Sequence, residues 1–256
     1  MSAAEPQPYR LGIFPHMPLA KLQSVFAPIA DDFSKALGRP VLLRTRTTFE
    51  KFESELRKET YDIAFIQPFS YVWAHDRYSY LPLARLSNPM KAILVVKRES
   101  TLKSIRDLRG LEIANPPRSA AVSNLTSIAL LQAGIDPNTG VHRIYAPNHF
   151  SCMQKVLLGE AAACGTVSRA MVLFEGKQKS PLFKVLAQTP QVPNSLFVVH
   201  SRVPEKDRKR LIHVILSWAA TEEGNKLLTN SQLSNFVVVT DDNYDILRHY
   251  KISTGP

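Results

Sequence analysis

The chain of 256 residues contains 45% hydrophobic and 21% charged residues, the composition of an ordinary soluble globular protein. This length is enough for two modest lobes with separate cores, or for one large domain. No apolar run approaches the roughly 18 residues that a membrane-spanning helix needs, so we expect no segment to cross a bilayer.

The net charge of +10 raises the question of a nucleic-acid partner. The Lys and Arg residues are scattered, with one local cluster at 206–210, and no basic stripe interleaved with aromatic residues accompanies them. We therefore expect no nucleic acid to bind. A basic surface would instead attract an anionic ligand or an acidic partner.

The first third of the chain predicts strands that alternate with helices. The predicted strands are residues 10–14, 41–43 and 62–66, and the predicted helices are residues 19–37, 49–56 and 69–74. Alternation at these lengths is typical of βαβ units, so we expect a mainly parallel sheet covered on both faces.

The alternation restarts after a strongly β-branched run at residues 93–96, and a similar run follows at 195–199. Between them the sequence predicts a helical turn at 104–108, strands at 111–114, 142–145 and 163–167, and helices at 119–133 and 149–158. After them it predicts helices at 205–219 and 222–228, an apolar run at 236–239 and a last helix from Asp242.

The two β-branched runs would be crossings that enclose an inserted lobe. We expect lobe one to contain residues 8–92 and 196–256, lobe two to contain residues 93–195, and residues 1–7 to be a flexible mature N-terminus. In open parallel sheets, ligands bind beyond the carboxyl ends of the strands. We therefore expect both lobes to border one cleft that closes on a small ligand by hinge motion.

Residues 115–133 give the most direct indication of a ligand site. Pro116 and Pro117 end the preceding strand, and Ser119 offers a hydroxyl that could cap the next helix. The first N–H groups of a helix lack partners within it and carry the positive end of its dipole, so they favour an anion. An ordinary capped helix that binds only water would show the same pattern.

The sequence contains two cysteines, Cys152 and Cys164. They could pair in principle, but their spacing fits a helix followed by a strand. We expect two separate thiols, each buried as an ordinary core residue.

Short motifs follow one another along nearly the whole chain. They include GIFP at 12–15, YDIAF at 61–65, PFSY at 68–71, IRDLRG at 105–110 and LLQAGID at 130–136. In this order and spacing the chain resembles the phosphate/phosphite/phosphonate solute-binding proteins of ABC transporters, the PhnD-like branch of the type II periplasmic binding fold. The resemblance implies a two-lobed α/β fold, each lobe a mainly parallel sheet flanked by helices, with two hinge crossings.

The positions that match the family's ligand contacts are partly altered. Relatives that bind phosphonates open the helix with a Ser-Thr-Ser type triplet, whereas the matching positions here are Ser119, Ala120 and Ala121. Two family tyrosines correspond to Phe49 and Met90. Each lost hydrogen bond is worth about 1 to 3 kcal/mol, so the ligand chemistry has changed while the scaffold is kept.

The resemblance and the expected turns together imply a set of ligand-binding residues. These are His16, Phe49, Gln67, Phe69, Tyr71, Met90, Ser119, Ala120, Ala121 and His149. Two of the aromatic residues, Phe69 and Tyr71, could instead belong to the core, and His149 could simply cap a helix. We expect neither a bound metal nor a cofactor.

A second hypothesis rests on soft or borderline donors. His16, His149 and Cys152, together with three nearby methionines, would suit arsenite, another inorganic oxyanion or a soft metal. The protein would then be a periplasmic sensor that signals to a histidine kinase.

An enzymatic role is not expected. The chain lacks a Gly-rich phosphate loop, a nucleophile elbow, a His-Glu-x-x-His pattern and metal-spaced cysteines. We expect instead a monomeric, exported periplasmic protein that delivers a small oxyanion or organic anion to an ABC permease. Its opening residues lack a basic segment followed by an apolar core, so the signal peptide is expected to be absent from this sequence.

Overall fold

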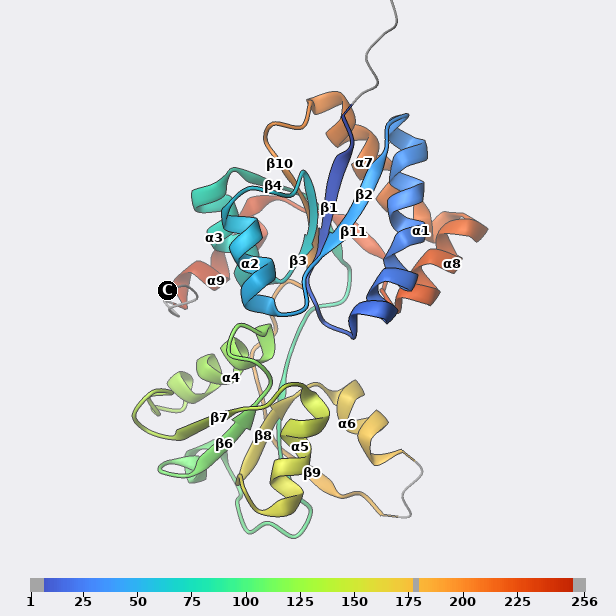
Figure 1. The fold of residues 1–256 in the computed structure, drawn as a ribbon. Coiled ribbons are helices and arrows are strands. Elements are labelled where there is room, and N and C mark those ends of the chain that lie inside the picture. Colours follow the sequence, from blue (N-terminus) through green and yellow to red (C-terminus); the bar gives the residue numbers. More distant parts are fainter. Residues whose placement is uncertain (1–6, 177–179, 251–256) are drawn as a thin grey trace, which may run out of the picture. The chain divides into compact units, whose positions relative to one another are not determined.

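The computed structural model describes residues 7–176 and 180–250. The described residues divide into two compact units: unit 1 contains residues 7–89 and 193–249, and unit 2 contains the described residues of 90–192 together with Tyr250. Unit 1 is therefore built from two segments that are distant in the sequence, the blue and the red parts of Figure 1. The segment predicted to be flexible, residues 1–7, lies outside the described residues except for Gln7.

Unit 1 is built on a six-stranded sheet with the order β11-β4-β10-β3-β1-β2. The strands β1, β2 and β3 are parallel neighbours, whereas β10 is antiparallel to both β3 and β4, and β11 is antiparallel to β4. The strands are β1 (Tyr9–Ile13), β2 (Val41–Thr45), β3 (Ile63–Ile66), β4 (Tyr80–Leu86), β10 (Leu196–His200) and β11 (Phe236–Val238).

Helices cover both faces of this sheet, with α1, α7 and α8 on one face and α2, α3 and α9 on the other (Figure 1). The helices are α1 (Leu19–Leu37), α2 (Phe49–Arg57), α3 (Pro68–Tyr78), α7 (Glu205–Ser217), α8 (Glu222–Ser231) and α9 (Asp245–His249), with short 3-10 turns η2 (Trp218–Ala220) and η3 (Asp241–Tyr244). The helix α1 ends where Gly38 adopts a left-handed conformation with φ 63°.

Aromatic side chains fill the core under α1. Phe33 of α1 stacks on Trp218 with ring centroids 5.7 Å apart, and Phe197 of β10 lies 4.8 Å from Phe65 of β3 and 5.4 Å from Phe236 of β11. These five residues come from segments that are distant in the sequence, so burying their rings ties the two chain segments of unit 1 together.

Unit 2 is built on a five-stranded sheet with the order β7-β6-β8-β5-β9. Its strands are β5 (Ile93–Lys97), β6 (Glu112–Asn115), β7 (His142–Tyr145), β8 (Ala163–Thr166) and β9 (Phe183–Gln188). Its helices are η1 (Ile105–Leu108), α4 (Ala121–Gln132), α5 (His149–Leu158) and α6 (Ser168–Glu175). In β5, Ile93 and Val95 join the core beside α5, while Leu94 and Val96 join the core beside α4. Both faces of β5 are buried, which explains its uninterrupted apolar run.

Both sheets are mixed, but most strands of each run in one direction, β1 to β4 in unit 1 and β6 to β9 in unit 2, so the expectation of mainly parallel sheets is confirmed. In unit 2, β6 is parallel to β7 and β8, but β5 is antiparallel to β8 and β9. A parallel neighbour requires a crossover connection. The strands β5 and β10 instead follow directly on the segments that connect the two units. The strand β5 lies antiparallel between β8 and β9, which α6 joins, and β10 lies antiparallel between β3 and β4, which α3 joins.

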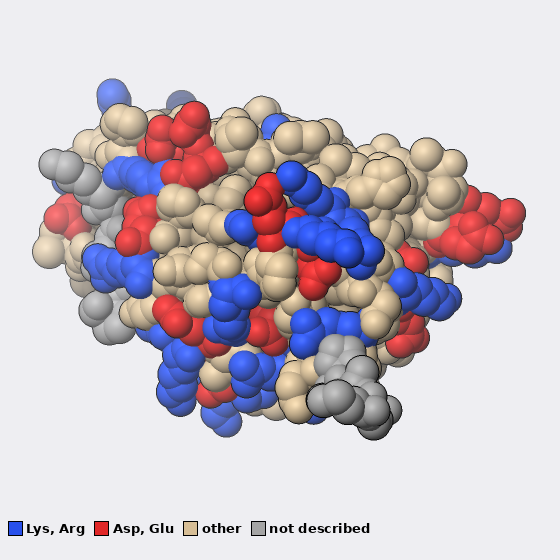
Figure 2. Space-filling model, turned by 90° about the horizontal axis from the view of Figure 1, so that it is seen from above, with Lys and Arg blue, Asp and Glu red and all other residues tan. Residues whose placement is uncertain are grey.

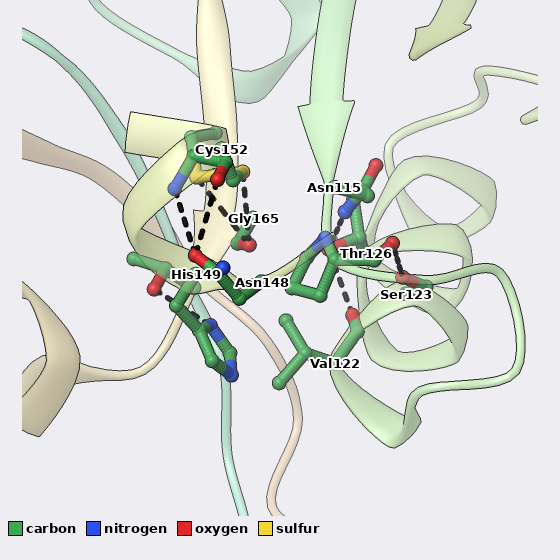
Figure 3. Close-up of a disulfide and its surroundings, with 12 residues drawn as sticks. Asn115, Val122, Ser123, Thr126, Asn148, His149, Cys152 and Gly165 are labelled. Carbon is green, nitrogen blue, oxygen red and sulfur yellow. Dashed lines mark hydrogen bonds between the residues drawn. A yellow bond between two sulfur atoms is a disulfide. The ribbon is translucent and has the colours of Figure 1, made fainter. Parts of the chain in front are cut away.

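The two cysteines form a disulfide, which contradicts the expectation of separate thiols. Cys152 lies in α5 and Cys164 in β8, as the predicted helix and strand require, but α5 packs against β8 and brings the two Cα atoms to 5.7 Å. That separation is typical of a disulfide. Both residues are fully buried in the core of unit 2 (Figure 3).

Charge on the face shown in Figure 2 is interspersed rather than concentrated. Figure 2 shows Lys and Arg side chains next to Asp and Glu side chains over the face in view. In the cluster at 206–210, Lys209 pairs with Glu205 at 2.7 Å, and Asp207 accepts a hydrogen bond from Tyr9 at 2.9 Å. No helix in the described part of the chain is both long and apolar enough to cross a membrane.

Candidate functional site

Three parallel strands of unit 2 end in polar or aromatic side chains at one edge of the sheet. The strand β6 ends at Asn115, β7 at Tyr145 and β8 at Thr166. Each is followed by a turn and then a helix, α4, α5 or α6, so three helix N-termini begin at this edge, which we call the carboxyl edge of unit 2. None of the three helices has an acidic residue in its first turn. Such an edge favours an anion.

The helix α4 begins at Ala121, not at Ser119 as the sequence predicted. Ala120 occupies the N-cap position without a side-chain cap, and its N–H donates to the Pro117 carbonyl at 2.9 Å. This additional turn delays the helix. The hydroxyl that secures the turn belongs to Ser123, whose Oγ donates to the Pro117 carbonyl at 3.0 Å. The expected capping role of Ser119 is therefore wrong.

Several polar atoms near the start of α4 are left unpaired. Ser119 Oγ and Asn115 Oδ1 are buried without a hydrogen-bond partner among the described residues, and the N–H of Val122 has no acceptor there. The other amide atom of Asn115, Nδ2, donates to Thr126 Oγ1 at 3.1 Å (Figure 3). Buried polar groups are nearly always paired, so these atoms indicate a place where a polar group binds.

His149 is the first residue of α5 and faces the end of β8. Asn148 caps this helix by accepting a hydrogen bond from the Ser151 N–H at 2.9 Å, so the capping role considered for His149 belongs to Asn148. The Nδ1 atom of His149 lies 2.9 Å from Thr166 Oγ1. Its Nε2 atom has no hydrogen-bond partner among the described residues, and burial lowers the pKa of the ring, which is therefore neutral near pH 7.

Close packing holds this arrangement together. A Cβ atom on Gly165 would lie 2.4 Å from both Asn115 Nδ2 and Thr126 Oγ1, so only glycine fits there. The disulfide joins Cys152, one helical turn after His149, to Cys164, two residues before Thr166. The site residues of β6, α4, α5 and β8 therefore belong to one packed cluster.

In unit 1, two of the predicted residues gather at the carboxyl end of β1. His16 is exposed, its Nδ1 lies 2.9 Å from the Phe14 carbonyl, and the rings of His16 and Phe14 are 4.6 Å apart. Phe49, the first residue of α2, is half-buried and lies 6.1 Å from the Phe14 ring. The rings of His16 and Phe49 thus both lie beside the ring of Phe14.

The remaining predicted residues of unit 1 are more deeply packed. Phe69 is buried, and Gln67 is buried at the N-cap of α3, where its carbonyl accepts the Tyr71 N–H at 2.9 Å. The Tyr71 side chain is fully buried, its hydroxyl donates to Asp241 Oδ1 at 2.8 Å, and burial raises its pKa. These contacts suit packing residues, the alternative kept open for Phe69 and Tyr71.

Three of the predicted residues of unit 2, Ala120, Ala121 and Met90, have no side-chain hydrogen-bond donor. Ala120 and Ala121 are buried at the start of α4. Met90 is half-buried and exchanges two backbone hydrogen bonds with Val192, at 2.8 and 2.9 Å.

Two arginines next to the carboxyl edge were not among the predicted ligand-binding residues. Arg118 precedes Ser119, and Arg143 lies on β7 two residues before Tyr145, whose ring both guanidinium groups approach. The sequence does indicate Arg118 as a candidate, because it lies in the turn between Pro117 and Ser119 that precedes the predicted helix.

A family model described as the periplasmic substrate-binding protein of the phosphonate ABC transporter matches residues 11–244. The chain belongs to this phosphonate-binding family. The resemblance noted in the sequence is thus confirmed. As a member of the family, the protein is a periplasmic substrate-binding component of an ABC transporter, a class of binding proteins rather than enzymes.

Solved structures of similar fold support the same architecture. A binding protein component of an ABC phosphonate transporter from Pseudomonas aeruginosa shares 18% identity over 96% of this chain and 86% of that chain, with a TM-score of 0.78. PhnD1 from Prochlorococcus marinus, solved with methylphosphonate, shares 17% identity over 96% and 97%, with a TM-score of 0.81. A Xanthomonas citri protein solved with ATP shares 16% identity over 96% of each chain, with a TM-score of 0.82. The predicted type II periplasmic binding fold is confirmed.

The disulfide bears directly on the soft-ligand hypothesis for this member of the family. Because Cys152 and Cys164 are bonded to each other, neither offers a thiolate to arsenite or to a soft metal. The described residues contain no group of three or more His, Cys, Asp or Glu side chains that could hold a metal ion.

Proposed function

We propose that the protein binds a small oxyanion or small organic anion, of phosphate or phosphonate type, at the carboxyl edge of unit 2. The observation that supports this most strongly is the position of His149. We assign the Thr166 hydroxyl as the donor to its Nδ1 atom, 2.9 Å away, and this assignment places the ring proton on Nε2, so a neutral ring offers an N–H to the ligand. The N–H of Val122 and the hydroxyl of Ser119 supply further donors at the start of α4.

The chemistry of solved relatives agrees with this proposal. One was solved with methylphosphonate, and a more distant one from Escherichia coli is an aliphatic sulphonate binding protein. Both ligands present a tetrahedral group of oxygens that needs several hydrogen-bond donors. The carboxyl edge of unit 2 offers donors, and no acidic residue in the first turns of its helices would repel the anion.

We also propose the transport cycle that the sequence led us to expect. The exported, monomeric protein closes its two units on the ligand, with His16 and Phe49 as contacts from unit 1, and presents the closed form to an ABC permease. Small-angle scattering would test closure, because ligand should reduce the radius of gyration of a monomer. The disulfide removes Cys152 from the donor set of the sensor hypothesis, so the transport role is the one that we propose.

The binding site can be tested by calorimetric titration with methylphosphonate, phosphate and sulfate. We expect at least one of these to bind and to raise the melting temperature. His149→Ala should weaken that binding about tenfold, the effect of losing one hydrogen bond to a charged group. The matched control is His142→Ala, which removes an exposed histidine at the start of β7 and should change little. Equal effects of the two substitutions, or no stabilisation by any anion, would overturn the proposal.

A further inference from the structure

Two arginines of unit 2 share one aromatic ring. The Cζ atom of Arg118 lies 4.9 Å from the centroid of the Tyr145 ring, and the Cζ atom of Arg143 lies 5.5 Å from it. Arg118 is exposed, whereas Tyr145 and Arg143 are half-buried. Two guanidinium groups so close together repel each other unless a negative group lies nearby.

The described residues provide no negative group for this pair of arginines. Neither Arg118 nor Arg143 has a carboxylate oxygen of these residues within 4.0 Å. Arg46 and Arg57, also half-buried, each pair with a glutamate, at 2.9 and 3.6 Å. A largely desolvated cation without a counter-charge is unfavourable, and desolvation accordingly lowers the pKa of Arg143.

The hydrogen bonds of Arg143 leave part of its guanidinium unused. One terminal nitrogen donates to Ser127 Oγ at 2.9 Å and the other to the Ser123 carbonyl at 3.2 Å. Its Nε atom is buried without a partner among the described residues. These contacts fix the guanidinium against the first two turns of α4 and leave the cation without an anion.

The arginine pair adjoins the proposed anion site. Arg118 directly precedes Ser119, and Tyr145 pairs in register with Asn115, so the ring lies beside the strand end that leads into α4. A ligand held at the start of α4 can therefore extend toward the two guanidinium groups.

We propose that Arg118 and Arg143 form a second anion subsite, so that the preferred ligand is an organic molecule with two anionic groups. This inference rests on the proposed function: one group, a phosphonate or phosphate, binds at His149 and the start of α4, and the other, a carboxylate or a second phosphate, binds the arginines. Guanidinium groups suit both kinds of oxyanion because they can donate two parallel hydrogen bonds.

The test compares ligands of matched length at fixed ionic strength. The probes are methylphosphonate, propylphosphonate and 3-phosphonopropionate, of which only the last has a second anionic group, a carboxylate. In the wild type, 3-phosphonopropionate should bind about tenfold more tightly than propylphosphonate, the usual effect of a charge-assisted hydrogen bond. Arg118→Gln should remove most of this preference, measured as the ratio of the two dissociation constants.

Two further variants separate the subsite from general charge and from folding defects. Arg106→Gln removes one exposed positive charge from η1, which precedes β6 at the other edge of the sheet, and should keep the preference. Arg143→Lys keeps the charge but not the paired donors, and should reduce the preference at an unchanged melting temperature.

The outcomes distinguish the two proposals. If the wild type binds propylphosphonate and 3-phosphonopropionate equally, or if Arg118→Gln and Arg106→Gln act alike, the subsite is excluded and the proposed function stands. If no phosphonate binds and no simple anion raises the melting temperature, the proposed function fails and the subsite with it.

Discussion

The Nδ1 atom of His149 lies 2.9 Å from the hydroxyl oxygen of Thr166. One residue opens α5 and the other ends β8, so this contact fixes the imidazole at the carboxyl edge of unit 2. Thr166 is fully buried, and its hydroxyl makes this one side-chain hydrogen bond in the described part of the chain. The orientation and the tautomer of the histidine both depend on it.

Replacing Thr166 with valine should weaken anion binding without unfolding the protein. Valine keeps nearly the same shape but removes the donor to Nδ1, so the ring is free to carry its proton on Nδ1, the wrong nitrogen for the ligand. We expect about a fivefold loss of affinity for the best-bound anion, the effect of one neutral hydrogen bond. Calorimetric titration measures it, with the melting temperature as the control. An unchanged dissociation constant would show that the hydroxyl does not orient the ring.

Burial of His149 should make the free energy of unfolding depend on pH. Burial lowers the pKa of His149 in the folded protein. At any pH between this lowered pKa and the ordinary pKa of histidine, the unfolded chain therefore binds more protons than the folded chain. The stabilisation from the neutral ring is therefore present above about pH 6.5 and is lost as the pH falls below it.

Urea unfolding of the wild type and His149→Gln at pH 7.5 and 5.5 tests this dependence. The wild type should lose more stability than the variant over this interval, by about 1.4 kcal/mol for each unit of pKa difference that falls within it. His142→Gln is the control and should behave like the wild type. If His149→Gln loses as much stability as the wild type, the buried ring is not the titrating group.

Local signals predicted the helices well where caps mark their ends. The predicted ranges 19–37 and 149–158 agree with α1 and α5 because Gly38 and Gly159 adopt left-handed conformations at their C-termini. The start of α4 was placed two residues early. A hydroxyl at Ser119 fits a cap, but the hydrogen bond between Ala120 and Pro117 extends the turn instead.

The sequence predicted less where distant segments decide the structure. The strand β4 was missed because Pro82 and Arg85 interrupt its apolar pattern; it exists because β10 and β11 pair with it on either side. The strand β9 and the helix α6 were also not predicted. Similarly, no local pattern shows that α5 lies against β8, so the pairing of Cys152 with Cys164 could not be distinguished from two thiols.

Removing the disulfide should lower the free energy of unfolding. The bond between Cys152 and Cys164 spans 12 positions and restricts the unfolded chain, which for a loop of this length corresponds to about 3 kcal/mol. The variant Cys152→Ala/Cys164→Ala should show this loss in urea unfolding. The reduced wild type is the control, because it lacks the bond but keeps both sulfur atoms in the core. Equal stability with and without reductant would show that the disulfide adds nothing.

The tightest packing at the candidate site lies at Gly165. A methyl group there would approach Asn115 Nδ2 and Thr126 Oγ1 to 2.4 Å, so Gly165→Ala must push β8 away from α4 or break the hydrogen bond between those two side chains. Overpacking of this kind costs about 1 to 3 kcal/mol, and the loss of a buried hydrogen bond adds to it. We therefore expect a larger fall in unfolding free energy than in the control Gly134→Ala.

That control isolates the cost of backbone conformation. Gly134 has a φ of +77° and nothing within 4 Å of its added Cβ, so alanine there should cost only about 1 to 2 kcal/mol for the left-handed conformation. Gly165→Ala should also weaken anion binding, because Asn115 ends the strand that leads into α4 and Thr166 follows the substituted residue. If Gly165→Ala proves no more costly than Gly134→Ala and binds anions normally, β8 and α4 are less rigidly packed than the contacts of Asn115 and Thr126 imply.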